Sequence, residues 1–179
     1  MSARISPGGR KEIGAVNALL AQLLGRVAGT NPPNVFTTLA RNRGLFRRWL
    51  VFAGGLMPGG TLPRRDTELL ILRVAHTCHC SYEWHHHQRL AKRAGLTAEE
   101  IARVRQGPDA EGWTPRQSAL LRAADELHGA RKIGDITWSA LRAFLDDSEL
   151  IELCMLVGHY EMLAMTLNSL GVEIDRPSR

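Results

Sequence analysis

Helical periodicity without an alternating strand pattern is the feature that most restricts the fold of this chain. Apolar residues recur every three or four positions over residues 11–28, and the same spacing returns from residue 64 onwards. The sequence contains no run in which Val, Ile or Thr alternates with polar residues. Because helices and half-buried strands differ in period, the sequence predicts an all-α protein.

Glycine and proline set the expected helix boundaries in the first third of the chain. Residues 30–34 contain two prolines and should end the first helix. Residues 35–56 should form one or two helices, with an interruption at Gly44 and an end at Gly54 and Gly55.

Threonine residues mark the expected helix starts in the rest of the chain. Thr97, Thr114 and Thr137 each precede a periodic segment, so each is an expected N-cap. The last helix is predicted over about residues 148–170, with a break near Gly158.

Composition excludes several classes of protein. The net charge of +5 is modest and scattered, and aromatic residues make up only 6%, which argues against a nucleic-acid partner. We find no apolar run near the roughly 18 residues of a membrane span and no secretory signal. Three cysteines are too few for a disulfide scaffold. We therefore expect a cytoplasmic protein with no membrane partner.

One segment concentrates the side chains that can carry chemistry. Five of the seven histidines and two of the three cysteines lie within twelve residues that end at His87. On a helix, positions i, i+3 and i+7 share one face, and Cys80, Glu83 and His87 have this spacing. A thiol, a carboxyl group and an imidazole are therefore predicted on one stripe, while His85 and His86 should face solvent.

Two further effects should tune this stripe. Glu68 lies on the preceding predicted helix and could reach His87 or Cys80 if the two helices form a hairpin. A carboxylate beside a histidine fixes its tautomer and makes it a better proton acceptor. Cys80 should lie near the N-terminus of its helix, where the helix dipole favours the thiolate.

This region resembles the core motif of the carboxymuconolactone decarboxylase family, which includes the alkylhydroperoxidase D (AhpD) proteins. The segments that carry the resemblance lie within residues 64–104 and are Arg64–Glu68, Cys80–His87 and Gly95–Ile101. The resemblance implies an AhpD-like helical bundle that forms a homo-oligomer, a trimer or a hexamer. Residues 1–60 would then be an N-terminal helical extension of a single domain spanning 1–179.

The two branches of the family place different demands on these residues. The peroxidase branch resembles Glu, then Cys-x-x-Cys, then x3-His, and Glu68, Cys80 and His87 match it. Glu83 stands where that branch has its second cysteine, so the redox pair is absent, and Cys78 could replace it only if residues 78–80 are not helical. The decarboxylase branch resembles Glu-x3-His, which Glu83 and His87 match.

The resemblance implies an enzyme that acts on a small molecule. In the first interpretation a small anionic lactone or related acid loses carbon dioxide, His87 acts as general acid and base, and Glu83 and Glu68 orient it or relay protons. The alternative is an alkylhydroperoxidase-like thiol peroxidase, with peroxiredoxin-type activity at Cys80. A non-catalytic oligomeric binding protein is a further alternative.

Other residues are weaker candidates for the same site. Arg73 or Arg64 could hold a substrate carboxylate, on the ground of charge alone. Tyr82 and His159 could contact substrate, although aromatic residues at such positions more often serve packing. Glu68 could equally form a structural ion pair with Arg64.

We expect neither a metal nor an organic cofactor. Cys80, Glu83 and His87 could supply three ligands to a catalytic zinc ion, but their spacing fits none of the familiar zinc patterns. The sequence contains no glycine-rich dinucleotide motif and no P-loop.

Overall fold

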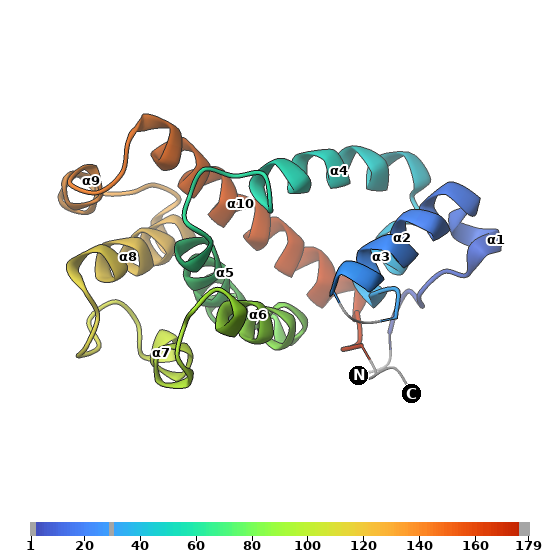
Figure 1. Cartoon of the computed structure of the whole chain (residues 1–179), viewed down its shortest axis with the longest axis horizontal. Coiled ribbons are helices and arrows are strands. Elements are labelled where there is room, and N and C mark those ends of the chain that lie inside the picture. Colours follow the sequence, from blue (N-terminus) through green and yellow to red (C-terminus); the bar gives the residue numbers. More distant parts are fainter. Residues whose placement is uncertain (1–2, 29–30, 176–179) are drawn as a thin grey trace. The chain divides into compact units, whose positions relative to one another are not determined.

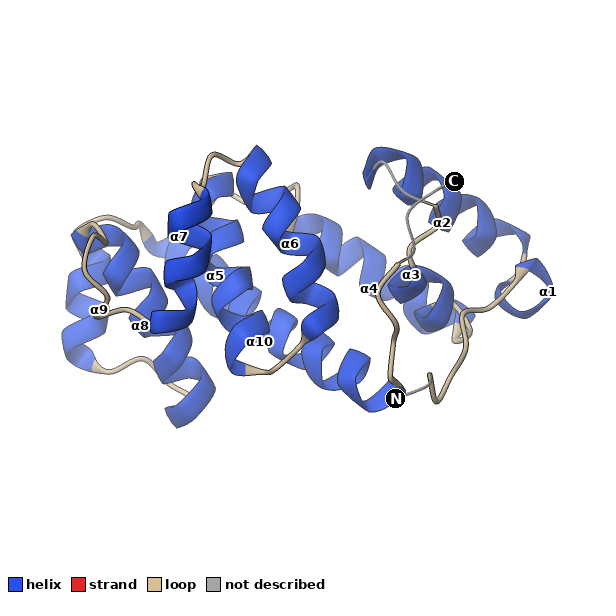
Figure 2. Cartoon of the chain, turned by 90° about the horizontal axis from the view of Figure 1, so that it is seen from below, coloured by secondary structure: helices blue, strands red, loops and turns tan. Residues whose placement is uncertain are grey.

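The computed structural model describes residues 3–28 and 31–175, and in this part of the chain it consists of helices and loops with no strand (Figure 1, Figure 2). The predicted all-α class is therefore confirmed. The chain divides into two compact units, one made of residues 1–58 and 166–179 and the other of residues 59–165. The single domain expected over residues 1–179 stays a prediction.

The first unit contains the N-terminal helices α1 (Arg10–Ile13), α2 (Ala15–Ala28), α3 (Asn34–Leu39) and α4 (Arg43–Leu56). The helix predicted over residues 11–28 is interrupted at Gly14, which has a left-handed φ of 81° and separates α1 from α2. A residue without Cβ adopts this conformation at little cost. Residue 30, where the predicted break begins, lies outside the described residues.

Residues 35–56 form two helices, as expected, and α4 ends at Leu56, next to the predicted end at Gly55, but the interruption predicted at Gly44 is wrong. The break falls before α4 at Asn42, whose side chain accepts a hydrogen bond from the backbone N–H of Leu45 at 3.3 Å. Gly44, Gly54 and Gly55 all lie inside α4. A glycine weakens a helix by only about 1 kcal/mol, so an N-cap and the packing of the apolar face decide where this helix runs.

The second unit is centred on α5 (Arg64–Thr77), which is buried around almost its whole circumference. Leu69, Leu70, Ile71 and Leu72 are each at most 1% exposed. Helix α5 packs against α6 (Ser81–Arg93) and α8 (Pro115–Ala130), as Figure 1 shows. Most side chains between Asp66 and Ala75 therefore lie in the interior of the unit.

Two of the predicted caps are confirmed in this unit. Thr97 begins α7 (Ala98–Arg103), which continues as the short helix η1 (Val104–Gln106), and it forms a capping box with Glu100. Thr114 begins α8 with a capping box to Gln117. In both, the threonine oxygen accepts from a backbone N–H that the helix itself leaves unpaired.

The third predicted cap is wrong. Helix α9 (Asp135–Arg142) starts two residues before Thr137, with Gly134 as its N-cap. The Thr137 hydroxyl instead donates to Glu126 Oε1 at 2.6 Å, and Thr137 is buried. A tertiary contact with α8 therefore holds a side chain that the local sequence favours as an N-cap.

The last helix, α10 (Asp147–Leu170), runs without the break predicted at Gly158. By length and composition alone, α10 could cross a membrane, so the expectation that the sequence holds no apolar run of that length is wrong. A core helix passes the same test, and Leu153, Leu156 and Ala164 of α10 are fully buried. The apolar character of α10 therefore has a packing explanation.

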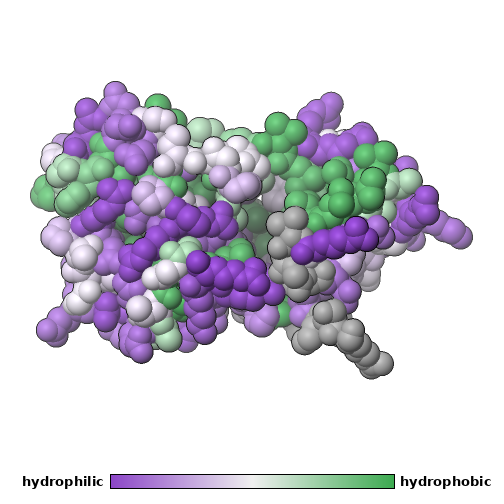
Figure 3. Space-filling view, in the orientation of Figure 1, coloured by the Kyte–Doolittle hydropathy of each residue, from purple (hydrophilic) through white to green (hydrophobic). Residues whose placement is uncertain are grey.

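Some apolar side chains of the second unit remain exposed. Ile136 and Trp138 on α9 are 88% and 42% exposed, and Ile151 on α10 is 63% exposed. Apolar side chains gather over α9 in Figure 3. The predicted homo-oligomer would cover such surface, and it stays a prediction.

Candidate active site

A buried contact between a carboxyl group and an imidazole joins the two helices of the predicted hairpin. Glu68 of α5 and His87 of α6 meet through Glu68 Oε2 and His87 Nδ1 at 2.8 Å. The side chain of Glu68 is 0% exposed and that of His87 is 9% exposed. The expected approach of Glu68 to His87 is therefore present. A carboxylate on Nδ1 fixes the tautomer of the ring and leaves Nε2 as the atom that exchanges a proton.

Arg64 extends this pair toward solvent. Its guanidinium NH2 lies 2.7 Å from Glu68 Oε1, one turn earlier on α5, and its side chain is 41% exposed. Glu68 is thus held by a histidine on one oxygen and by an arginine on the other. Arg64 therefore forms a structural ion pair with Glu68 and also places a positive charge near the site.

Tyr160, on α10, contacts the His87 side of this group. Its ring meets the ring of His87 edge to face, with centroids 5.2 Å apart and an interplanar angle of 89°. Complete burial, together with the carboxylates of Glu68 and Glu83, raises the pKa of Tyr160 well above its usual value. Tyr160 therefore stays a neutral phenol. Residue spacing does not predict the contact between Tyr160 and His87, because Tyr160 lies on a helix far along the chain.

Cys80 is the N-cap residue of α6 and is 1% exposed. Burial and the neighbouring Glu83 carboxyl group raise the pKa of its thiol to about 12, although the backbone N–H groups of Glu83 and Tyr82 act in the opposite direction. The predicted position of Cys80 at the helix N-terminus is therefore confirmed, but the net effect of its surroundings is to disfavour the thiolate. The dipole contributes about 1 kcal/mol at such a position, and burial outweighs it.

Glu83 lies one turn after Cys80 and is 2% exposed. Burial raises the pKa of its carboxyl group to about 8, and the neighbouring Cys80 thiol acts in the opposite direction. In the described part of the chain, neither carboxyl oxygen has a hydrogen-bond partner. Glu83 is therefore mainly protonated at neutral pH, as a buried carboxyl group without a cation should be.

The predicted stripe of Cys80, Glu83 and His87 is thus buried along its whole length. The carboxyl group of Glu83 lies one helical turn from the Cys80 thiol, and both Glu83 and Glu68 raise the pKa of Tyr160. Such a set holds one imidazole, one neutral carboxylic acid and one neutral phenol in a buried interior. It is equipped to move protons rather than to present a ready nucleophile.

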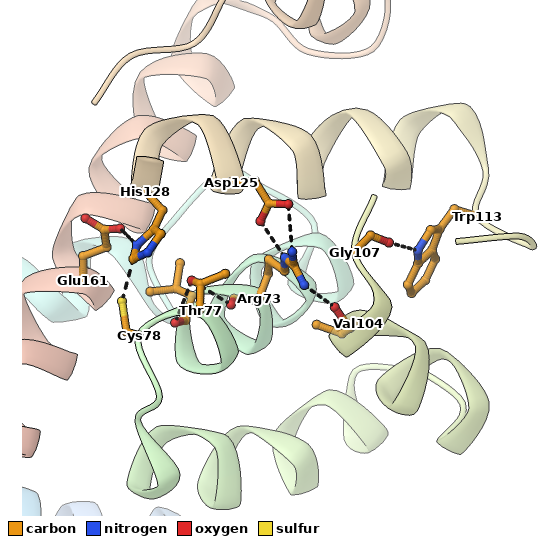
Figure 4. Close-up of polar contacts among 10 residues, drawn as sticks. Arg73, Thr77, Cys78, Val104, Gly107, Trp113, Asp125, His128 and Glu161 are labelled. Atoms are coloured by element: carbon orange, nitrogen blue, oxygen red, sulfur yellow. Dashed lines mark hydrogen bonds and ion pairs between the residues drawn. The ribbon is translucent and has the colours of Figure 1, made fainter. Parts of the chain in front are cut away.

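The other predicted contact residues fall in different surroundings. Arg73 donates from Nε and NH2 to both oxygens of Asp125, at 2.6 and 2.8 Å, and from NH1 to the carbonyl of Val104 (Figure 4). Its guanidinium is occupied by α8 and η1, so the structure gives it a structural partner in place of a substrate carboxylate.

Tyr82 and His159 are both buried next to residues of this region. Tyr82 stacks on His86, with centroids 4.5 Å apart, and is 6% exposed. His159 meets Tyr160 edge to face at 5.2 Å, and burial lowers its pKa to about 4. His86 is half-buried, against the prediction of a solvent face, whereas His85 is exposed as expected.

An AhpD-like helical fold is confirmed by solved structures. The chain is similar to an uncharacterized peroxidase-related protein with an alkylhydroperoxidase AhpD core from Ralstonia eutropha, at 21% identity over 97% of this chain and 93% of that one, with a TM-score of 0.81. A peroxidase-related protein from Silicibacter is similar at 15% identity over 96% and 92%, with a TM-score of 0.77.

A third structure carries a ligand. The debrominase Bmp8, in a cysteine-to-alanine variant bound to 2,3,4-tribromopyrrole, is similar at 12% identity over 98% of this chain and 93% of that chain, with a TM-score of 0.81. Identities this low establish the fold alone. Among curated proteins, no sequence match is found.

The family follows from the sequence of the central region. Residues 43–126 match the model of the carboxymuconolactone decarboxylase family. The resemblance carried by the motif is confirmed over this region. The match contains Glu68, Cys80, Glu83 and His87.

Proposed function

We propose that this protein is an enzyme of the carboxymuconolactone decarboxylase family that uses His87 as a general acid and base on a small anionic lactone or a related acid. The observation that carries the proposal is the buried contact of 2.8 Å between His87 Nδ1 and Glu68 Oε2. A carboxylate–imidazole pair shielded from water is suited to proton transfer near neutral pH.

The proposed reaction is loss of carbon dioxide from the lactone. The carbon–carbon bond to the leaving carboxylate breaks, and its electron pair enters the unsaturated lactone. His87, in its protonated form, then delivers a proton from Nε2 to the carbon that has gained the pair. Glu68 stabilises the imidazolium form of His87 during the cycle, and Arg64 lies close enough to Glu68 to attract the anionic substrate.

Glu83 has a separate role in this proposal. Because its pKa is about 8, it is available at neutral pH as a proton donor on the same helical stripe as His87. A neutral carboxylic acid can restore the proton that His87 gives away. This role needs no thiolate, which agrees with the high pKa of Cys80.

A thiol peroxidase is the second candidate function. The observation that favours it is that the buried Cys80 thiol and the buried Glu83 carboxyl group lie one helical turn apart and act on each other, so the ionised form of Glu83 could accept the thiol proton as peroxide arrives. Cys80 would become a sulfenic acid, the peroxide would leave as an alcohol, and an external thiol would reduce the enzyme.

Cys78 is a poor partner for such a cycle. Residues 78–80 form a turn rather than a helix, so the backbone condition for a second thiol is met. The Cys78 sulfur, however, lies 3.8 Å from His128 Nδ1, on the side of α8 (Figure 4). The second candidate therefore depends on an external reductant.

Parallel assays on the purified full chain test both candidates. In one arm a carboxylated muconolactone is the substrate and released carbon dioxide is measured. In the other arm an organic hydroperoxide is supplied with a dithiol. The variants are His87→Gln, Cys80→Ser and, as a matched control on the same helix, His85→Gln, because His85 is exposed.

The proposal requires carbon dioxide release that falls about 100-fold or more in His87→Gln and persists in His85→Gln and Cys80→Ser. Peroxide turnover that disappears only in Cys80→Ser would replace the lyase with the second candidate. Inactivity in both arms, with a folded protein, would leave the non-catalytic binding protein. We also propose a cytoplasmic homo-oligomer, a trimer or a hexamer, which light scattering on the eluted protein can test.

A further inference from the structure

A second cluster of chemically active side chains lies away from the His87 group. Cys78 follows the end of α5, His128 lies in the last turn of α8, and Glu161 lies on α10. Figure 4 shows the three side chains pointing toward one another from these separate elements. One ligand atom of each, Sγ, a ring nitrogen and a carboxylate oxygen, lies within 4.8 Å of the others.

The three atoms converge on one ring nitrogen. His128 Nδ1 is 2.6 Å from Glu161 Oε1 and 3.8 Å from Cys78 Sγ. In a nucleophile–base–acid relay the thiol and the carboxylate occupy opposite nitrogens of the imidazole, so that the proton passes through the ring. Here both approach the same nitrogen. This arrangement does not suit a relay. It places one donor atom of each residue close enough to the others to bind a common ion.

The surroundings of the cluster favour a cation. The C-terminal ends of α5 and α8 both lie here, and the carbonyl ends of helices carry partial negative charge. Arg131 NH1 binds Glu161 Oε2 at 2.7 Å, which leaves Oε1 directed toward His128. An outer hydrogen bond of this kind orients a ligating carboxylate. The Arg131 side chain is 70% exposed, so solvent screens the repulsion between its charge and a bound cation.

We propose that Cys78, His128 and Glu161 form a binding site for a zinc-class divalent cation. Sulfur, nitrogen and oxygen ligands together suit Zn²⁺, and three protein ligands leave a fourth position for water. The side chain of His128 is 38% exposed, so solvent and the ion can reach the site. This proposal is independent of the proposed decarboxylase function, because none of its ligands belongs to the His87 group.

The distances allow coordination with a small adjustment. Ligands about 2.3 Å and 2.0 Å from a tetrahedral zinc ion are themselves separated by roughly 3.5 Å, close to the separation of Cys78 Sγ and His128 Nδ1. The hydrogen-bonded contact between His128 and Glu161 must open by less than about 1 Å. The half-exposed His128 side chain has room for this rotation.

Metal titration of the full chain tests the proposal. After treatment with a chelator, the protein is titrated with Co²⁺ and then with Zn²⁺. We expect one ion per chain and a thiolate-to-cobalt charge-transfer band that Zn²⁺ abolishes. The band should be lost in Cys78→Ser and weakened in His128→Gln, whereas Cys154→Ser and Cys80→Ser should keep it, each with circular dichroism to show that the variant is folded.

A second readout does not depend on variants. Bound Zn²⁺ should protect Cys78, and not Cys154, from alkylation in the unmodified chain, as read by peptide mass spectrometry. If no thiolate band forms, if Cys80→Ser abolishes it, or if Zn²⁺ gives Cys78 no protection, the proposal is overturned. The cluster is then a hydrogen-bonded contact between α8 and α10.

Discussion

Cys80 and Glu83 lie one helical turn apart at the start of α6, and burial keeps both side chains protonated at neutral pH. Burial raises the pKa of the thiol to about 12 and that of the carboxyl group to about 8. Each also acts on the other, because an ionised Glu83 opposes a thiolate at Cys80. Only one of the two groups can carry charge at a time, as in other close pairs of ionisable groups.

The first prediction concerns the reactivity of Cys80. A thiol with a pKa near 12 has a thiolate fraction about 1,000-fold below that of an ordinary cysteine at neutral pH. We therefore expect iodoacetamide to label Cys80 at least that much more slowly in the folded chain than in urea, as measured by peptide mass spectrometry. Glu83→Gln should speed labelling at alkaline pH, because it removes the opposing charge. Equal labelling rates in the folded and unfolded chain would contradict the burial argument and favour the thiol peroxidase.

The second prediction concerns stability and pH. The folded-state pKa of Glu83 is about 8, against an ordinary value of 4.5. Between these values the unfolded chain has released a proton that the folded chain keeps, so Glu83 makes stability fall as pH rises, and the fall ends above about pH 8. The slope from one such group reaches about 1.4 kcal/mol per pH unit.

Urea unfolding at several pH values measures this slope. Glu83→Gln cannot ionise, so its unfolding free energy should vary less with pH over the same range. Glu99→Gln, on the exposed side of α7, is the matched control and should keep the wild-type slope. A Glu83→Gln variant with the wild-type slope would show that this carboxyl group titrates normally.

The third prediction separates a structural arginine from a substrate-binding one. Arg73→Met breaks the paired contacts with Asp125 and leaves that carboxylate without its guanidinium. Losing one partner of a largely buried pair costs about 3 kcal/mol. We expect the variant to unfold at lower urea concentration and to keep the KM of the wild type. A raised KM with unchanged stability would instead return Arg73 to the substrate site.

The parts of this site that the sequence predicts are those fixed by local geometry. Cys80, Glu83 and His87 share a face because the helix period determines it, and Glu68 meets His87 because the two helices are adjacent in the chain. Tyr160 contacts His87 although it lies 73 positions further along the sequence, and such a contact depends on tertiary packing. Residue spacing alone therefore cannot predict that Tyr160 contacts His87.

The errors have the same origin. Thr137 is a good N-cap by residue type, yet a partly buried hydrogen bond to Glu126 holds it inside α9. The dipole argument for Cys80 is sound locally, but it depends on exposure, which the sequence does not give. His128 and Glu161 lie near Cys78 only because α8 and α10 pack there. No sequence motif predicts this cluster.

The fourth prediction tests whether Arg64 attracts the substrate. Its contact with Glu68 is partly exposed, so it should add at most about 1 kcal/mol to stability. A charge-assisted contact with an anionic substrate is worth about 1.5 to 3 kcal/mol, which corresponds to a loss of about 10- to 100-fold in kcat/KM for Arg64→Gln. Added salt should reduce the difference from wild type, because it screens the attraction.

Arg65→Gln is the matched control for this experiment. Arg65 is the neighbour of Arg64 in α5 and carries the same charge, but it pairs with Glu100 of α7. Its loss changes the net charge equally and leaves Glu68 and His87 untouched, so kcat/KM should stay near the wild-type value. If both variants lose activity to the same extent, long-range charge is responsible. A loss confined to Arg64→Gln, and partly restored in Arg64→Lys, requires a cation at this position beside the buried pair.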